Sequence, residues 1–269
     1  MRKALALLVV AMAMLAARAS DVTAQANRQA ETKAVAQTRA RAERGDASAQ
    51  FSLGIMYATG KGVPQDYGQT VVWWRKAADQ GSALAQFNLG LMYGTGRGVP
   101  LDYVQAAAWY RKAADQGLAS AQFGLGVMYA NGEGVPQDYG QAVSWYRKAA
   151  LQGLADAQCN LGLSYAKGQG VLKDEVEGAA WLRKAAEHGH AEAQFNLGVM
   201  YASGRGVPQD YVEAHTWMTL AASAASRQNQ DTYARGRDAI AEQMTPVQLA
   251  EARTLAQEWA VAFERRKKK

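Results

Sequence analysis

The chain has 269 residues, of which 49% are hydrophobic and 20% charged, a balance typical of a globular protein. Its formal net charge is +6, but the first 18 residues contribute +3 and the last five contribute +5, so the residues between them carry about −2. This distribution excludes a folded basic surface of the kind that binds nucleic acid. The single cysteine, Cys159, excludes an intramolecular disulfide.

The first segment has the form of an export signal. Arg2 and Lys3 precede an apolar run over 4–16, and Ala17-Arg18-Ala19 has the small-x-small pattern of a cleavage site. The apolar run is shorter than the roughly 20 residues that span a bilayer. We therefore expect residues 1–19 to be removed, although a second cleavage site follows Ala26. The mature chain is expected to be periplasmic or secreted, with no stable membrane span.

A pattern of 36 residues then recurs five times and is the main signal in the chain. Every copy has a glutamine, a Leu-Gly pair, a tyrosine, two glycines around one variable residue, an aspartate, a tryptophan and an Ala-Ala pair. The glutamines are Gln50, Gln86, Gln122, Gln158 and Gln194. We expect a capping segment over 20–46, repeats over 47–82, 83–118, 119–154, 155–190 and 191–226, capping helices over 227–265 and a basic tail over 266–269.

The spacing within each copy predicts two helices. In the second copy, Ala85, Leu89 and Met92 recur at intervals of three and four residues, as on the apolar face of a helix. The segment 96–100 contains two glycines and a proline and ends that helix. Asp102, with glutamine three residues later, resembles the capping box that starts another helix. The aspartate at this position is therefore assigned to capping and not to catalysis.

Each copy also has a glycine inside its first helix, where glycine costs about 1 kcal/mol relative to alanine. These residues are Gly54, Gly90, Gly126, Gly162 and Gly198. Because this cost in free energy recurs in all five copies, we expect a favourable interaction that offsets it in each copy. We expect each glycine to lie at a close contact between helices that leaves no room for a methyl group, as where stacked repeats bury a continuous core.

The motif Ala-x-Ala-Gln-Phe-Asn-Leu-Gly-x-Met-Tyr, followed by Gly-x-Gly-Val-Pro-x-Asp-Tyr and Ala-x-x-Trp-Tyr-Arg-Lys-Ala-Ala-x-x-Gly, resembles the Sel1-like repeat, a relative of the tetratricopeptide repeat. The resemblance implies an all-α, right-handed superhelical solenoid of antiparallel helix pairs. It also implies an adaptor in envelope, signalling or host-contact complexes. The fourth copy departs most from the motif, with Cys159, Ser164, Leu172 and Glu175, and is expected to be the most weakly packed.

Positions on the first helix that vary or stay polar are the candidates for binding. We assign them to the concave face of the solenoid, where asparagine can bind a peptide backbone and methionine can adapt to varied apolar groups. For the methionines, packing between helices in the core is an equally good interpretation. The thirteen candidates are Ser52, Asn88, Asn160, Asn196, Met56, Met92, Met128, Met200, Thr59, Thr95, Asn131, Lys167 and Ser203.

We therefore predict a monomeric, non-enzymatic scaffold that binds a protein or peptide and uses no cofactor. The alternative is a β-lactamase-like or cell-wall-peptide hydrolase, because Ser164-Tyr165-Ala166-Lys167 has the Ser-x-x-Lys form and some cysteine-rich Sel1-like proteins have been linked to β-lactam binding. The companion Ser-Asp-Asn and Lys-Thr-Gly motifs of such enzymes are absent from the sequence.

Two histidine patterns admit a structural interpretation as well as a functional one. Glu187, His188, His190 and Glu192 offer metal-binding side chains, but the two histidines lie at variable boundary positions between repeats, so no metal site is predicted. His215 replaces valine or alanine on a second helix and is expected at the surface or half-buried. The basic tail is either a solubilising helix end or an attachment to an anionic envelope polymer.

Overall fold

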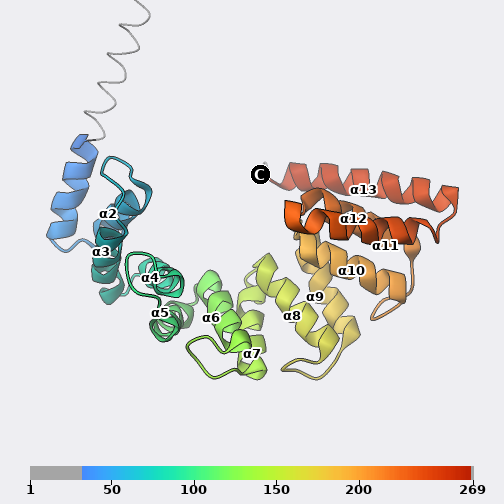
Figure 1. Cartoon of the computed structure of the whole chain (residues 1–269), viewed down its shortest axis with the longest axis horizontal. Helices are drawn as coiled ribbons and strands as arrows, with labels where there is room; N and C mark the ends of the chain where they lie inside the picture. Colours follow the sequence, from blue (N-terminus) through green and yellow to red (C-terminus); the bar gives the residue numbers. More distant parts are fainter. Residues whose placement is uncertain (1–31, 268–269) are drawn as a thin grey trace, which may run out of the picture. The chain divides into compact units, whose positions relative to one another are not determined.

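The computed structural model describes residues 32–267, and all of the regular structure in this range is helical (Figure 1). The predicted leader over 1–19 and the second cleavage site lie outside the described residues. The helices group into two compact units that divide between Trp109 and Tyr110. No helix within 32–267 is both long enough and apolar enough to cross a membrane.

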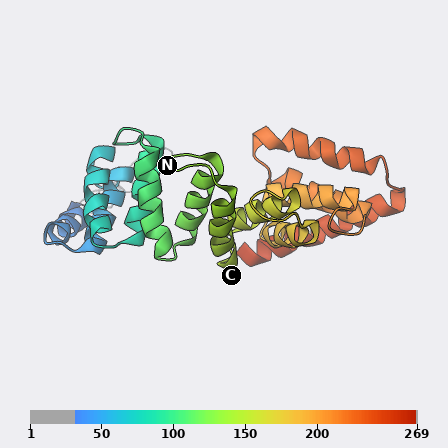
Figure 2. The ribbon, with the colours of Figure 1, turned by 90° about the horizontal axis from the view of Figure 1, so that it is seen from below.

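Each repeat consists of two helices, as its sequence predicts. The first unit contains a helix over 32–43, α2 (Ala47–Thr59), α3 (Tyr67–Asp79), α4 (Ala83–Thr95) and the start of α5 (Tyr103–Asp115). The second unit contains the rest of α5, α6 (Ala119–Asn131), α7 (Tyr139–Leu151), α8 (Ala155–Lys167), α9 (Glu175–Glu187), α10 (Ala191–Ser203), α11 (Tyr211–Ala224), α12 (Arg227–Ala241) and α13 (Pro246–Lys267). Consecutive helices pack side by side from α2 to α4 and from α6 to α12, whereas α13 packs against α11 (Figures 1 and 2).

The repeated aspartate caps the second helix of every repeat. One carboxylate oxygen accepts a hydrogen bond from the backbone N–H three residues later, which satisfies a donor that the helix itself leaves unpaired. The prediction of an aspartate N-cap is thus confirmed, but the reciprocal bond of a capping box is not formed, because the N–H of each aspartate donates to the carbonyl of a tyrosine nine residues earlier. The five bonds are Asp66 to Gln69 at 2.9 Å, Asp102 to Gln105 at 3.0 Å, Asp138 to Gln141 at 2.9 Å, Asp174 to Glu177 at 2.9 Å and Asp210 to Glu213 at 3.1 Å.

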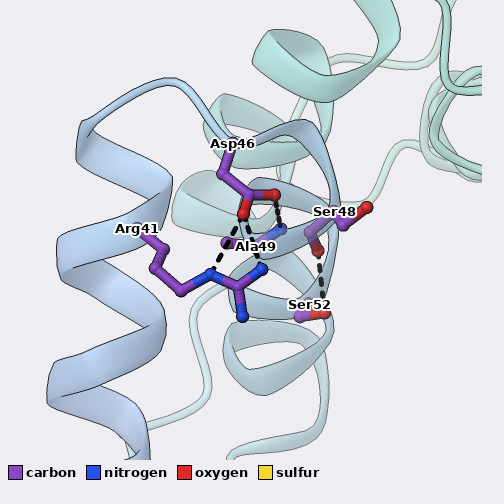
Figure 3. Close-up of polar contacts among 5 residues, drawn as sticks. All are labelled: Arg41, Asp46, Ser48, Ala49 and Ser52. Carbon is purple, nitrogen blue, oxygen red and sulfur yellow. Dashed lines mark hydrogen bonds and ion pairs between the residues drawn. The ribbon is translucent and has the colours of Figure 1, made fainter.

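The start of α2 shows how the helix over 32–43 joins the first repeat (Figure 3). Asp46 lies between the backbone N–H of Ala49, at 3.0 Å, and the guanidinium of Arg41, at 2.6 Å. These two contacts, the Ala49 bond first, lower the pKa of Asp46. In the next turn Ser52 donates to the carbonyl of Ser48. The helix over 32–43 is therefore fixed to α2 by a charge-assisted cap.

The repeated glutamine joins each repeat to the helix before it. Its side chain is buried, and its Nε2 donates to the carbonyl of an alanine eight residues earlier, at the end of the preceding helix. That carbonyl also accepts a bond from a turn residue, so both of its lone pairs are used. The bonds run from Gln50 to Ala42 (3.0 Å), Gln86 to Ala78 (3.0 Å), Gln122 to Ala114 (3.2 Å), Gln158 to Ala150 (3.2 Å) and Gln194 to Ala186 (3.1 Å).

In the first and third repeats, the side-chain amide of a second glutamine donates a hydrogen bond to Oε1 of the repeated glutamine. Gln80 donates to Oε1 of Gln50 at 2.7 Å, and Gln152 donates to Oε1 of Gln122 at 2.8 Å. In the fourth repeat this position is His188, whose Nδ1 instead bonds to the carbonyl of Lys184. Oε1 of Gln158 is consequently buried without a partner. Oε1 of Gln194 in the fifth repeat is also buried without a partner, so this feature does not set the fourth repeat apart, and its weaker packing stays a prediction.

An arginine and a tyrosine form a further link between consecutive repeats. The arginine on the second helix of each of the first four repeats donates to the hydroxyl of a tyrosine 18 residues later, on the next first helix. Arg39 makes the same bond to Tyr57 from the helix over 32–43. That helix therefore takes the place of a preceding second helix. The repeat pairs are Arg75 with Tyr93, Arg111 with Tyr129, Arg147 with Tyr165 and Arg183 with Tyr201.

The glycines inside the first helices lie where helices approach closely, as predicted. A Cβ built on Gly162 would lie 2.9 Å from the backbone oxygen of Gly178, and one built on Gly54 would lie 2.3 Å from the ring of Trp74. In both repeats the contact is with the second helix of the same pair. The methyl-free surface thus compensates for the low helix propensity of glycine.

The helices after the fifth repeat close the core of the second unit. Tyr233 on α12 is buried and lies 36 residues after Leu197, while Gln230, at the position of the repeated glutamine, is exposed. The ring centroids of Trp217 and Trp259 are 5.0 Å apart, which joins α11 to α13. Helix α12 therefore keeps the packing of a first helix without its inter-repeat bond.

The contact at Gly162 predicts a large effect of one methyl group. Gly162→Ala should lower the free energy of unfolding by about 1–3 kcal/mol, because its Cβ overlaps the backbone of α9. Gly94→Ala is the matched control: its Cβ would lie 3.7 Å from Ala106, so it should stabilise by about 0.4–1 kcal/mol. Urea unfolding followed by circular dichroism measures both, and equal effects would contradict the close contact.

The unpartnered oxygen of Gln158 predicts a stabilising substitution. His188→Gln places an amide where Gln80 and Gln152 have theirs, and should raise the free energy of unfolding by about 1 kcal/mol. His188→Ala cannot donate to Gln158 and should bring no gain. Thermal unfolding of the two variants tests this, and a gain from alanine equal to that from glutamine would refute the hydrogen-bond explanation.

Candidate functional site

The thirteen predicted binding residues lie on the first helices, at three different depths. Met92, Met128 and Met200 are buried, with 5%, 4% and 4% of their surface exposed, and pack in the core. The half-buried candidates are Met56, Asn88, Asn160 and Asn196. The exposed candidates are Ser52, Thr59, Thr95, Asn131, Lys167 and Ser203. A partner has direct access only to the exposed and half-buried residues.

The sequence analysis missed an aliphatic row on the same surface. It runs one residue before the methionines and is exposed or half-buried, with exposures of 41% at Ile55 and 40% at Leu91. The row consists of Ile55 and Leu91 in the first unit and of Val127, Leu163 and Val199 in the second. The sequence does mark this row, because the position is aliphatic in every copy. Apolar residues shared by all copies are ordinarily assigned to the core, so the row was not recognised as exposed.

The second unit has a hollow of about 180 Å³ between α6, α7 and α8. Tyr139 and Tyr146 form one side, and the predicted residues Asn160 and Lys167 form the other, with Ser164 between them. Burial raises the pKa of Tyr146, while a hydrogen bond with the side chain of Asn160 opposes that rise. We call this the first junction hollow.

A second hollow, of about 100 Å³, lies between α8, α9 and α10. Its lining follows that of the first hollow at an interval of 36 residues: Asn196 replaces Asn160, Met200 replaces Ser164, and Arg205 replaces Gln169. We call it the second junction hollow. Because the two are equivalent in register, the hollow is a product of stacking one repeat on the next, and its chemistry is set by the residues that vary.

The loop between paired helices fixes one rim residue of each hollow. Gly206 has φ +69°, and a Cβ built on it would lie 2.0 Å from the backbone oxygen of Glu175. Only glycine fits this contact, which holds the loop over 204–206 against the start of α9. Arg205 is thereby placed at the rim of the second junction hollow.

The hydroxyl in the Ser-x-x-Lys motif is not arranged as a nucleophile. Ser164 donates from Oγ to the carbonyl of Asn160 at 2.8 Å within α8, and its exposure is 9%. The hydrogen bonds of the described residues include none between Ser164 and Lys167. Cys159 offers no alternative nucleophile, because it is fully buried and burial raises the pKa of its thiol.

The histidines at the boundary of the fourth and fifth repeats make structural bonds. Nδ1 of His190 accepts from the backbone N–H of Ala193 and so caps α10, while Nε2 lies 3.2 Å from a carboxylate oxygen of Asp156. No group of three or more histidine, cysteine, aspartate or glutamate residues is arranged to hold a metal ion within 32–267. His188 and His190 therefore lie at a C-cap and an N-cap, and His190 also joins the start of α10 to Asp156 on α8.

A model of the Sel1 repeat matches residues 47–82, 83–118, 119–154, 155–190 and 191–226. The chain belongs to the Sel1 repeat family. The match agrees with the helix pairs and the inter-repeat bonds that the structure shows. The fold is accordingly an all-helical solenoid of Sel1 repeats.

Two solved structures are similar over most of this Sel1 repeat chain. One is a protective antigen present in uropathogenic Escherichia coli strains, 38% identical, with 85% of this chain and 49% of that chain covered and a TM-score of 0.75. The other is a Sel1 repeat protein from Oxalobacter formigenes, 34% identical, with 77% and 87% covered and a TM-score of 0.68. The chain thus spans about half the length of the E. coli antigen. A search of curated proteins found no match.

His215 carries the clearest electrostatic signal among the histidines. The expectation that it lies at the surface or half-buried was wrong, since it is 4% exposed, in the buried row where other repeats have valine or alanine. Burial lowers its pKa, and the nearby charges of Arg237 and Arg253 lower it further, while Asp238 opposes them. The folded chain therefore favours the neutral imidazole.

This lowered pKa predicts how stability depends on pH. The unfolded chain binds a proton at His215 near pH 6.5, whereas the folded chain does so only at lower pH, so folding stability should fall as the pH drops below about 6.5. His215→Val, which copies Val71 and Val143, should lose less stability between pH 7.5 and 5.5 than the wild type. Urea unfolding at the two pH values measures the difference. Identical losses would show that His215 does not titrate as its burial requires.

Proposed function

We propose that the first-helix surface of the second unit binds an extended segment of a partner protein. This surface consists of the exposed and half-buried residues of α6, α8 and α10 together with the two junction hollows. Sel1 repeats are commonly protein-interaction scaffolds, which agrees with such a role. The equivalent rows on α2 and α4 offer a surface of the same kind in the first unit.

The observation that carries the proposal is the recurrence of the junction hollow beside an aliphatic row. An extended segment has side chains that alternate in direction and backbone groups that need hydrogen bonds. Leu163 and Val199 line the hollows and can pack against apolar side chains. Asn196 donates from Nδ2 to Glu192, and its Oδ1 can accept from a partner's backbone N–H. One surface therefore offers both kinds of contact at regular spacing.

A binding role explains the geometry better than hydrolysis does. The Sel1 repeat family is generally non-catalytic. The hydroxyl of Ser164 is bonded within its own helix, and Lys167 is exposed beside it without a hydrogen bond to it. We therefore assign both residues to the lining of the first junction hollow.

We also propose that the scaffold works outside the cytoplasm as a monomer. The support for export is the sequence of the leader, with its positive start, short apolar run and cleavage site after Ala19. Removal of residues 1–19 would leave the repeats and their capping helices as the mature chain. No cofactor is needed for the proposed role.

Site-specific photocrosslinking tests the binding surface. A benzophenone amino acid is placed at Leu163 and, in a second variant, at Val199. Both variants should crosslink the same partner protein in the cells that naturally produce this protein. The same probe at Ser144, which is exposed on a second helix, is the matched control and should not capture that protein. The captured protein is identified by mass spectrometry after purification under denaturing conditions.

Leu163→Asp should weaken binding of the captured protein at least about tenfold, since it puts a charge where an apolar side chain packs. Because Leu163 is half-buried and packs against the core of the second unit, the circular dichroism spectrum and the unfolding curve of the variant are compared with those of the wild type, so that loss of binding is separated from loss of folding. Capture of the same protein from Ser144, or no capture from either Leu163 or Val199, would overturn the proposed function.

A further inference from the structure

The second junction hollow brings two cations to one place. Lys167, at the end of α8, and Arg205, in the loop after α10, both line it. Neither residue forms an ion pair with any acid that the structure describes, and Arg205 donates from Nε to the hydroxyl of Ser203 at 3.1 Å. Two positive charges at one small hollow repel each other unless an anion lies between them.

The acid at the same hollow does not supply that anion. Glu175 lines the hollow, but its carboxylate lies 2.9 Å from the ammonium of Lys173, so its charge is already compensated. The position of Arg205 is fixed by the contact between Gly206 and the backbone of Glu175. The backbone of Arg205 is therefore held beside the hollow.

Interaction with a helix dipole explains the position of only one of the two cations. Lys167 lies in the last turn of α8, where a positive side chain interacts favourably with the helix dipole. Arg205 lies beyond the end of α10, in a loop, so the same explanation does not extend to it. Their convergence on one hollow needs a separate reason.

The two cations do not belong to a continuous basic track. In the second unit, the loop position of Arg205 is occupied by Glu133 and Gln169 in the preceding repeats. The helix position of Lys167 is occupied by Asn131 and Ser203 in the neighbouring repeats. A polyanion such as a nucleic acid or an acidic polysaccharide would need a row of cations along its length. An isolated pair fits one anionic group instead.

We infer that the second junction hollow binds a carboxylate side chain, aspartate or glutamate, of an extended partner segment. This inference rests on the proposed function and adds the chemical class of the partner. The carboxylate lies between the ammonium of Lys167 and the guanidinium of Arg205, which donate charge-assisted hydrogen bonds to it. A neighbouring apolar side chain of the segment packs on Leu163 or Val199. The first junction hollow, whose one cation is this same Lys167 and whose lining includes two tyrosines, takes an uncharged side chain.

Selection from a randomised peptide display library tests the inference even while the partner is unidentified. The full chain is immobilised and used to select dodecapeptides. Wild-type protein should enrich peptides that carry aspartate or glutamate at a fixed distance from an aliphatic residue. A synthetic peptide of this class should bind at least about tenfold more tightly than its asparagine or glutamine counterpart, measured by fluorescence anisotropy.

Charge reversal provides the matched comparison. Lys167→Glu/Arg205→Glu should lose the preference for acidic peptides and bind the selected peptide at least about tenfold more weakly. Arg227→Glu, at an exposed position at the start of α12, should keep both the preference for acidic peptides and the affinity for the selected peptide. Unfolding curves for the three proteins show whether they are equally folded.

The inference is overturned by any of four outcomes. These are no enriched peptides, no acidic preference in the wild type, the same preference in the charge-reversal variant, or tighter binding of heparin or single-stranded DNA than of the acidic peptide. Crosslinking from Leu163 distinguishes this failure from failure of the proposed function. If Leu163 still captures its partner in the Lys167→Glu/Arg205→Glu background, the binding surface stands and the carboxylate assignment does not.

Discussion

The hydrogen bond from each repeated glutamine to the end of the preceding helix is the interaction on which the packing of the repeats depends. The alanine carbonyl that it satisfies is covered by the next repeat, where water cannot take the place of the amide. No apolar side chain can replace it, because loss of the donor leaves a buried acceptor unpaired. Gln158 shows the cost of losing even the second half of this network. The same residue thus fixes the register of consecutive helix pairs within each unit.

That register also determines where variation is tolerated. Residues that make the helix pair, such as Gly162 and the capping aspartates, face a similar environment in each repeat and have little freedom. Residues around a junction hollow touch solvent, so their chemistry can change without loss of the stack. The replacement of Gln169 by Arg205 changes the charge of a hollow that recurs at the same register. A repeated architecture can in this way present a non-repeated surface.

The sequence predicted the fold well because its signals are local and repeated. The capping aspartates and the crowded glycines follow from hydrogen-bond and steric rules that act within one helix pair. The degree to which individual side chains on a helix are buried was predicted poorly. Met92 and Leu91 are adjacent in sequence, yet Met92 is buried and Leu91 is exposed, and no spacing rule shows how far the neighbouring helix covers each of them. His215 was misplaced for a related reason, since its polarity outweighed the buried row to which it belongs.

The exposed amide of Gln230 has a consequence for how this architecture can change in length. Helix α12 accepts the packing of the fifth repeat through Tyr233 but offers no buried glutamine bond to α11. A further 36-residue module placed before Ser226 would meet the same neighbours on both sides as an existing repeat. One placed after α12 would follow a helix at a first-helix position, whereas the repeated glutamine donates to the end of a second helix. Tandem duplication is therefore structurally permitted on one side of α12, and the number of modules can evolve while the terminal helices stay the same.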